Sequence, residues 1–326
     1  MYTIWLVQEQ KSAKFVTMKG PLFYAKILLF GEYGIIKNSK GLSIPYNYHK
    51  GALRMDNNTS ESAVSSNAKL IDFAKYLITL DNALVQFDHN RLSADLTKGM
   101  YFDSSIPQGY GVGSSGALVA AIYDRYAFEK ITVLENLTRE KLTKLKNIFS
   151  EMESFFHGKS SGLDPLNSFL SLPILIHSKS DIEPTGIPSQ SQKGKAAVFL
   201  LDSGMTSETA PLVSIFLDNF ELPSFRKMMK EEFITISDRC IEHFLSGNIT
   251  DLFSDIKKLS SVVLEHFNPM IPDRFRSLWK KGIETNAYYL KLCGSGGGGY
   301  ILGFTQDLPK AKSLLADHQL KVVYTF

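Results

Sequence analysis

The chain has 326 residues, 44% of them hydrophobic and 21% charged, with a formal net charge of +3 at pH 7. These values are ordinary for a globular protein large enough for two domains. The nearly balanced charge excludes a strong basic field for nucleic acid, and no apolar run approaches the roughly 20 residues of a bilayer span.

Cysteine usage and the first residues bear on the compartment. Cys240 and Cys293 stand far apart with no C-x-x-C spacing, which argues against a disulfide framework or a structural zinc site and fits a reducing environment. The segment Met1–Lys14 carries Gln8-Glu9-Gln10-Lys11 where a signal peptide would stay apolar. We therefore expect a cytoplasmic protein, a monomer or a homodimer, with neither nucleic acid nor a membrane as partner.

In chain order, the first half alternates strand-like and helix-like segments. Residues 1–17 are interpreted as a dispensable extension, because Met18 directly precedes the first strong strand. Apolar spacing then predicts strands at 23–30 and 42–48, a surface loop at 56–66, a helix at 68–80, a strand at 100–102, helices at 117–128 and 133–156, a short helix at 161–170 and an extended segment at 173–177.

The second half begins after the Ser/Gln/Gly/Pro-rich segment 184–194, which is the best linker candidate. The pattern beyond it predicts a strand at 196–202, helices at 222–245, 249–267 and 272–286, strands at 288–292 and 300–304 around a glycine loop, a helix at 308–317 and a strand at 320–326. This mixture predicts an α+β fold of two domains, residues 1–187 and 188–326.

The segment Pro107–Leu118 is the most informative part of the chain, because it combines four glycines and two adjacent serines with the start of a helix-forming stretch. Glycines allow backbone N–H groups to turn toward a ligand, and the start of a helix favours an anion. A purely structural loop with a serine cap is the alternative. A dinucleotide-binding G-x-G-x-x-G is disfavoured because residues 104–108 do not end a strand, and Glu153 stands where a P-loop ending in Gly158-Lys159-Ser160 needs its first glycine.

Three further blocks carry candidate chemistry. Lys26 lies inside an apolar strand, where it either snorkels to water or pairs with a carboxylate. The segment 153–168 holds Glu153, His157, Ser161 and Asp164, although Ser161-x-x-Asp164 also resembles a helix capping box. The segment 292–300 has five glycines in six residues, which indicates close backbone approach to a ligand or a flexible hairpin.

Together the four blocks resemble the GHMP kinases, the family named for galactokinase, homoserine kinase, mevalonate kinase and phosphomevalonate kinase. The likeness is greatest to the mevalonate kinase branch. The family motifs P-x-K-x-x-L-x-G-E-H, P-x-G-x-G-L-G-S-S-A-A, E…H-G-x-x-S-G-x-D-x-x-x-S and K-x-x-G-x-G-G-G-G are matched in order by Tyr24–Tyr33, Pro107–Ala117, Glu153–Ser168 and Lys291–Gly299. The chain departs from them with Tyr24 for Pro, Val112 for Leu, Gly116 for Ala and Tyr33 for His.

The resemblance implies a ribosomal protein S5 domain 2-like N-terminal domain and a ferredoxin-like C-terminal domain. It also implies Asp164 as general base or orienting acceptor, with Lys26 as its cationic partner. ATP would be cradled by Pro107, Gly109, Gly111, Gly113, Ser114, Ser115 and Gly116, with Mg²⁺ on Ser115 and Glu153. The acceptor pocket would involve Glu32, Tyr33, His157, Ser161, Gly294, Ser295 and Gly296.

The expected function is therefore Mg²⁺·ATP-dependent phosphorylation of a small alcohol, with the primary hydroxyl of mevalonate first among the acceptors. Alternatives are phosphomevalonate or another alcohol or sugar as acceptor, or a non-catalytic ATP-binding regulator. A phosphorylated acceptor would need extra basic residues. At the start of the second domain, Ser203–Thr209 has no Lys or Arg where mevalonate kinases tend to carry K-x-x-R-x-T.

Overall fold

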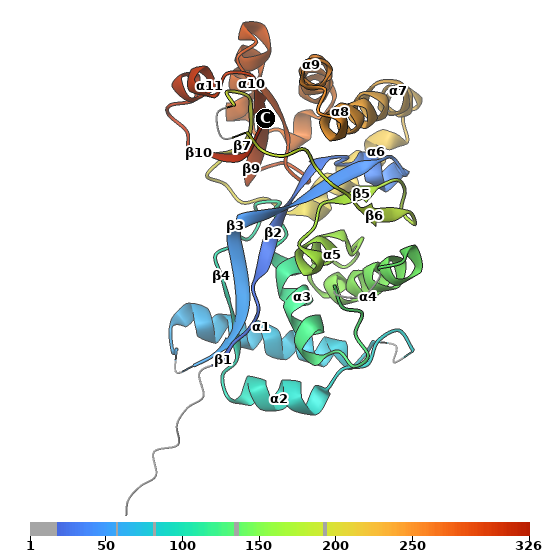
Figure 1. Cartoon of the computed structure of the whole chain (residues 1–326), viewed down its shortest axis with the longest axis vertical. Helices are drawn as coiled ribbons and strands as arrows, with labels where there is room; N and C mark the ends of the chain where they lie inside the picture. Colours follow the sequence, from blue (N-terminus) through green and yellow to red (C-terminus); the bar gives the residue numbers. More distant parts are fainter. Residues whose placement is uncertain (1–17, 57, 81–82, 134–136, 192–193) are drawn as a thin grey trace, which may run out of the picture.

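The computed structural model describes residues 18–326, except 57, 81–82, 134–136 and 192–193. The interpretation of residues 1–17 as an extension lies outside the described residues. The chain builds two sheets, one from strands within residues 18–184 and one from strands within residues 197–325 (Figure 1). The predicted domain boundary at 187/188 lies between these two groups of strands.

The first sheet has six strands and is organised around the long strand β3, with which four of the others pair directly. Their bounds are β1 Met18–Lys19, β2 Phe23–Phe30, β3 Gly41–Met55, β4 Tyr101–Ser104, β5 Ile174–Ile176 and β6 Ile182–Pro184. Strand β3 pairs antiparallel with β1, β2, β4 and β5, and β5 pairs with β6. In β2 every residue except Tyr24 is buried, which explains its apolar run, interrupted only by Lys26.

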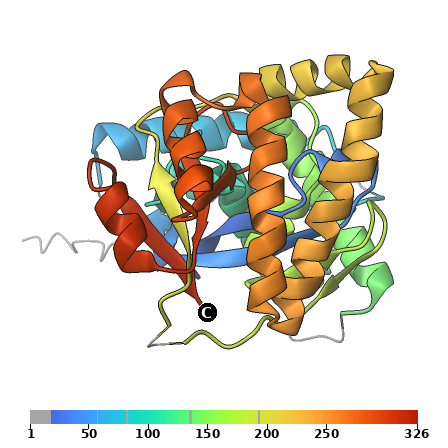
Figure 2. The same ribbon diagram turned by 90° about the horizontal axis from the view of Figure 1, so that it is seen from above.

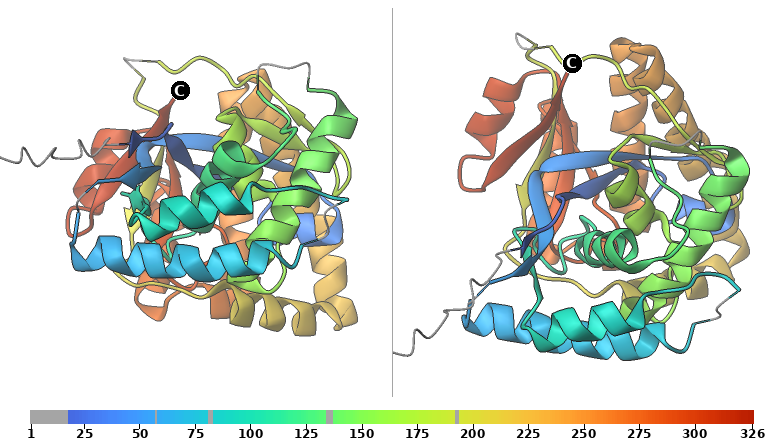
Figure 3. Two further views of the ribbon diagram at one scale, coloured as in Figure 1. Left: turned by 90° about the horizontal axis from the view of Figure 1, so that it is seen from below. Right: turned by 60° about the horizontal axis from the view of Figure 1, so that its bottom comes forward.

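Helices pack against this sheet or, as the one at His89–Thr97 does, against other helices of the same layer. They are α1 Glu61–Leu77, α2 His89–Thr97, α3 Ser114–Tyr126, α4 Arg139–His157 and α5 Leu163–Leu170, with a short 3₁₀ turn, η1, at Gly34–Lys37. Helix α3 contacts β2, β3, α4 and α5, and its small apolar residues allow it to lie in the middle of this layer. Seen from below, α1 and α2 lie on the side away from the C-terminal helices (Figure 3).

The second sheet is fully antiparallel, in the order β10–β7–β9–β8. Its strands are β7 Ala197–Asp202, β8 Tyr289–Leu292, β9 Tyr300–Thr305 and β10 Leu320–Thr325. The helices between β7 and β8 are α6 Thr209–Phe220, α7 Pro223–Met228, α8 Thr235–Ser246, α9 Ile249–His266 and α10 Asp273–Thr285, and α11 Leu308–Leu314 joins β9 to β10 (Figure 2). This β-α-β-β-α-β order is the ferredoxin-like arrangement.

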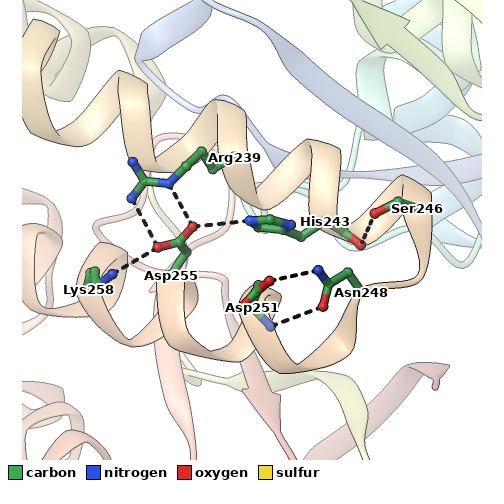
Figure 4. Close-up of polar contacts among 7 residues, drawn as sticks. All are labelled: Arg239, His243, Ser246, Asn248, Asp251, Asp255 and Lys258. Carbon is green, nitrogen blue, oxygen red and sulfur yellow. Dashed lines mark hydrogen bonds and ion pairs between the residues drawn. The ribbon is translucent and has the colours of Figure 1, made fainter.

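Helices α8 and α9 form an antiparallel hairpin in which a carboxylate of α9 pairs with an arginine of α8. The Asp255 side chain is 7% exposed and accepts hydrogen bonds from Arg239 Nε at 2.8 Å and Nη2 at 3.0 Å (Figure 4). Lys258 Nζ lies 3.2 Å from Asp255 Oδ1, and His243 Nε2 lies 3.6 Å from Asp255 Oδ2. The hydrogen bonds from Arg239 hold the pKa of Asp255 below its ordinary value.

The α+β fold class is confirmed, and most of the expected elements are present within a few residues. The loop expected at 56–66 is wrong in its second half, because Ser60 caps α1 by accepting from the N–H of Ala63 and the helix begins at Glu61. The helix expected at 222–245 is interrupted by a π-helical turn, η2, at Met229–Ile234. Helices α2 and α6 were not expected. Of the helices in the described part of the chain, none is both long and apolar enough for a bilayer crossing.

Candidate functional site

Lys26 and Asp164 form a close ion pair between β2 and α5. Lys26 Nζ lies 2.7 Å from Asp164 Oδ1, and the two side chains are 7% and 35% exposed. Burial acts to lower the pKa of Lys26, but the charge and the hydrogen bond of Asp164 outweigh it and raise that pKa. Of the two alternatives for this lysine, the structure therefore has the paired one, with its ammonium group beside a half-exposed carboxylate.

The glycine loop covers this pair. The N–H of Lys26 donates to the carbonyl of Val112 at 3.0 Å, which fixes the loop on β2. Gly113 has a φ of 79° and caps α3, and a Cβ there would lie 3.0 Å from Lys26 Cγ and 3.6 Å from Asp164 Oδ2. The first turn of α3, with Ser114, Ser115 and Gly116, thus starts directly above the ion pair with N–H groups that have no partner within the helix.

A second acidic group lies beside the same helix start. Ser115 Oγ donates to Glu153 Oε1 at 2.8 Å and lies 2.9 Å from His157 Nε2, while Ser160 Oγ donates to Glu153 Oε2 at 2.5 Å. Glu153 and His157 share one face of α4 because they are four residues apart. Burial of Glu153, followed by the negative charge of Asp164, raises the pKa of this carboxyl to about 7.

The donor set around Glu153 fits a hard divalent cation. It offers a carboxylate and hydroxyl oxygens, which are the ligands that Mg²⁺ prefers. The hydroxyls of Ser115 and Ser160 donate to the buried carboxylate, so a cation there would offset the charge that burial and Asp164 disfavour. Within the described ranges no group of three or more His, Cys, Asp and Glu side chains could hold a metal ion alone. The remaining ligands would have to come from a bound phosphate and water.

Gly116 sets how closely α3 approaches α5. A Cβ at this position would lie 2.7 Å from both Asp164 C and Pro165 N, closer than real Cβ atoms come. The departure from Ala to Gly at this position is therefore explained by packing, since the backbone of Asp164 fills the space of the missing methyl group.

The second glycine-rich loop, residues 293–299, packs on the first one. A Cβ on Gly111 would lie 2.7 Å from the carbonyl oxygen of Cys293, and one on Gly299 would overlap Tyr110. The N–H of Ser207 donates to the carbonyl of Gly109 at 3.1 Å on the same side. Because β8 and β9 pair directly on either side, this loop is a hairpin connection and also a close backbone contact. The absent side chains in it make room for protein backbone.

The expected acceptor residues fall into four places. Tyr33 Oη donates to the carbonyl of Ser295 at 2.7 Å, which brings these two together, and Ser295 Oγ lies 3.3 Å from Thr209 Oγ1 at the start of α6. His157 lies with Ser115, and Ser161 is exposed, with Oγ accepting from the N–H of Leu163 at 3.4 Å.

Glu32 lies apart from them in a buried ion pair. Its Oε1 is 2.7 Å from Lys291 Nζ, and both side chains are 2% exposed. The contact is an ion pair rather than a well-aligned hydrogen bond. Burial raises the pKa of Glu32, and Lys291 offsets this only in part. This pair joins the end of β2 to β8 and leaves Glu32 out of contact with solvent.

Sequence reasoning gave no site role to Ser160 and Lys291, and it considered Thr209 only as a match to the threonine of K-x-x-R-x-T. The structure places all three against predicted site residues. Lys291 is the first residue of the fourth motif, so its position was visible. Its partner was not, because a motif does not reveal which carboxylate a buried lysine meets. Ser160 falls on a variable position of the third motif and left no signal.

Part of the chain matches a known protein family. Residues 79–171 match the family model described as GHMP kinases N terminal domain. This segment is similar to the N-terminal domain of the GHMP kinases. It contains the glycine loop, Glu153 and Asp164, whereas Lys26 and the loop 293–299 lie outside the matched residues. A comparison with curated proteins found no match to this sequence.

Solved GHMP kinase structures have the same fold over nearly the whole chain. The L. major mevalonate kinase in complex with R-mevalonate has 17% identity and a TM-score of 0.63, over 92% of this chain and 91% of that one. The Methanococcus jannaschii mevalonate kinase has 17% identity and a TM-score of 0.59, over 96% and 99%. A Streptococcus pneumoniae phosphomevalonate kinase with phosphomevalonate and AMPPNP has 12% identity and a TM-score of 0.57, over 95% and 99%. At these identities the likeness shows the GHMP kinase fold.

Proposed function

We propose that this protein is a Mg²⁺·ATP-dependent small-molecule kinase that phosphorylates mevalonate on its primary hydroxyl. The observation that carries the proposal is the Lys26–Asp164 pair beneath the glycine loop, with Ser115 and Glu153 beside it. A binding protein without catalysis would need the loop but would gain nothing from a buried lysine paired with a half-exposed carboxylate.

Each group has a role that its chemistry permits. Asp164 would orient the acceptor hydroxyl and accept its proton as the oxygen attacks the γ-phosphorus. Lys26 keeps its positive charge and would offset the charge of the transferring phosphoryl oxygens. The first turn of α3 would hold the β- and γ-phosphates through its N–H groups. Mg²⁺ on Ser115 and Glu153 would neutralise phosphate charge when bound.

The choice of acceptor rests on fewer observations. Tyr33, Ser295 and Thr209 bring hydroxyl groups close together, which suits a polar, uncharged part of a small alcohol. Mevalonate kinases are among the structures with this fold over more than nine-tenths of the chain. Phosphomevalonate is the second candidate, because a kinase crystallised with it shares the fold and because the chain has Tyr33 after Gly31-Glu32.

A coupled assay of ADP release with mevalonate, phosphomevalonate, galactose and homoserine tests the proposal. We expect Mg²⁺-dependent turnover with mevalonate at least about tenfold above the other three, since a site that hydrogen-bonds its substrate discriminates strongly. Turnover with another acceptor alone would keep the kinase and reject mevalonate. ATP binding without turnover on any of the four would favour a non-catalytic regulator.

We also propose a cytoplasmic location. Cys240 and Cys293 are both free and buried, which agrees with a reducing environment.

A further inference from the structure

Ser160 lies in the turn between α4 and α5 and contacts the buried carboxylate of Glu153. Its Oγ donates to Glu153 Oε2 at 2.5 Å, while the other oxygen, Oε1, accepts from Ser115 Oγ at 2.8 Å. Glu153 is 3% exposed, so protein groups rather than bulk water have to supply its hydrogen bonds. The two oxygens of one carboxylate are thus divided between two serines from different parts of the fold.

The direction of the bond from Ser160 is fixed by a second contact of the same hydroxyl group. The N–H of Gly162 donates to Ser160 Oγ at 3.0 Å, so this oxygen already accepts one hydrogen bond. The hydroxyl hydrogen is left for Glu153, since an ionised carboxylate can only accept. Because Ser160 accepts from one side and donates to the other, it is suited to orienting the carboxylate rather than to binding a cation itself.

The turn that carries Ser160 is attached to the side of α4. Ser150 Oγ donates to the carbonyl of Ser160 at 2.6 Å. Gly162, with a φ of 72°, packs so closely on α4 that a Cβ there would overlap the carbonyl oxygen of Lys146. Helix α4 in turn contacts both α3 and α5, which lie beside it (Figure 1). Ser160 therefore meets Glu153 from a fixed position, set by the helix that also carries the carboxylate.

We propose that Ser160 is a positioning residue for the divalent cation: by holding Glu153 Oε2, it keeps Oε1 directed at Ser115 and the start of α3. This inference rests on the proposed Mg²⁺·ATP-dependent function. Carboxylates that bind metals are themselves oriented by hydrogen bonds, and loss of such a partner typically lowers metal affinity about 10–100-fold. The serine of the family motif, Ser161, is exposed and its Oγ accepts from the N–H of Leu163, so the orienting role falls to a variable position of the motif.

Titration with Mn²⁺, followed by electron paramagnetic resonance, tests the proposal on the full chain in the presence of a saturating non-hydrolysable ATP analogue. Mn²⁺ takes the same oxygen ligands as Mg²⁺. We expect Ser160→Ala to weaken Mn²⁺ binding about tenfold or more, and to leave the affinity for the analogue in EDTA unchanged. Ser154→Ala is the matched control, because Ser154 directly follows Glu153 in α4 but donates to the backbone carbonyl of Ser150. Its Mn²⁺ affinity should stay within about twofold of wild type.

Two further variants separate the hydrogen bond from the shape of the turn. Ser160→Thr keeps the hydroxyl group and should restore most of the Mn²⁺ affinity, whereas Ser160→Cys has nearly the same shape but is a weak donor and should behave like Ser160→Ala. If Ser160→Ala does not fold, the comparison of these two variants carries the test.

The outcomes separate this inference from the proposed function. Equal Mn²⁺ affinity in wild type and Ser160→Ala would overturn the role of Ser160 and leave the kinase standing. Equal losses in the Thr and Cys variants, or a parallel loss of analogue binding in EDTA, would show a structural role of the turn and overturn it as well. A wild-type protein that binds no Mn²⁺ with the analogue would contradict the Mg²⁺-dependent function and this inference together.

Discussion

Asp164 is the residue on which the proposed chemistry depends most directly. Replacing it by Asn keeps the shape but removes the proton acceptor and the partner of Lys26. We expect turnover to fall by about 10²–10⁴-fold, the usual worth of a general base, while affinity for an ATP analogue stays within a few-fold. Steady-state kinetics and analogue titration measure the two. Near-normal turnover would contradict the mechanism, and Asp72→Asn on the exposed face of α1 is the control for loss of one charge.

Lys26 can be replaced without also replacing Asp164, because water can solvate the carboxylate that is left unpaired. Asp164 is 35% exposed, so Lys26→Met leaves a carboxylate that water can reach, and the fold should survive. We expect kcat to fall by about 10²–10³-fold through loss of charge stabilisation in the transition state. Kinetics and a thermal unfolding curve check this together, and an unchanged kcat would remove Lys26 from the catalytic group.

For single residues, the sequence motifs identified candidate site residues but did not show which side chain each of them contacts. The pairing of Lys26 with Asp164 followed from the family resemblance, since an apolar strand with one lysine allows two outcomes. Glu32 was expected at the acceptor, yet it lies buried with Lys291. A sequence shows that a carboxylate follows a strand, but which cation enters from the other sheet is decided by tertiary packing.

Between elements, the crossing of α3 and α5 is controlled by one missing methyl group. Alanine at position 116 would gain about 0.5–1 kcal/mol of helix propensity over glycine, but overpacking costs about 1–3 kcal/mol. Because the added Cβ meets the backbone of Asp164, the cost should prevail. We expect Gly116→Ala to lower both the unfolding temperature and kcat. Gly186→Ala, where nothing lies within 4 Å, should change neither; a more stable and equally active Gly116→Ala would contradict the packing argument.

The α8–α9 hairpin should show a pH-dependent contribution from Asp255. Its pKa in the fold is below the ordinary 3.8, so the stabilisation is present above that value and is lost as the pH falls through the folded pKa. We expect Asp255→Asn to lower the free energy of unfolding by about 1–2 kcal/mol at pH 7, with the difference shrinking below about pH 4.

Urea unfolding at pH 7, 4 and 3 measures the effect of Asp255→Asn. Asp251→Asn on the same helix is the matched control, because its carboxylate is exposed and bonds only to Asn248 in the hairpin. A difference between Asp255→Asn and the wild type that stays constant down to pH 3 would disprove the assignment.

Periodicity located most elements because long apolar faces dominate the signal, as in α9 and α10. It missed α6, whose apolar residues follow no clean helical stripe and of which only Phe216 is buried. It also placed the start of α1 too late, since residues 61–66 are mostly polar or exposed and only the cap at Ser60 marks the beginning. For α1, capping chemistry rather than hydrophobic spacing carried the missing information, whereas α6 has no side-chain cap at its start.

In the whole molecule, the Glu32–Lys291 pair is a buried ion pair that connects the two sheets. Removing one partner leaves the other charged and buried, so Lys291→Met should cost about 3–5 kcal/mol of stability. The double variant Glu32→Gln with Lys291→Met should recover a large part of this loss, because no unpaired charge remains. Chemical unfolding of wild type, both single variants and the double variant forms the cycle. A double variant no more stable than Lys291→Met would show that the pair is not coupled.

The contact between the two glycine loops has a consequence for exchanging halves between related kinases. Gly111 and Gly299 each use the space of a missing side chain to touch backbone of the other loop, so the join is made by main chain on both sides. Main chain cannot be adjusted by choosing another rotamer. A hybrid protein that takes one sheet from each parent would therefore have to inherit residues 107–113 and 293–299 from the same parent, even though these segments lie far apart in the gene and belong to different sheets.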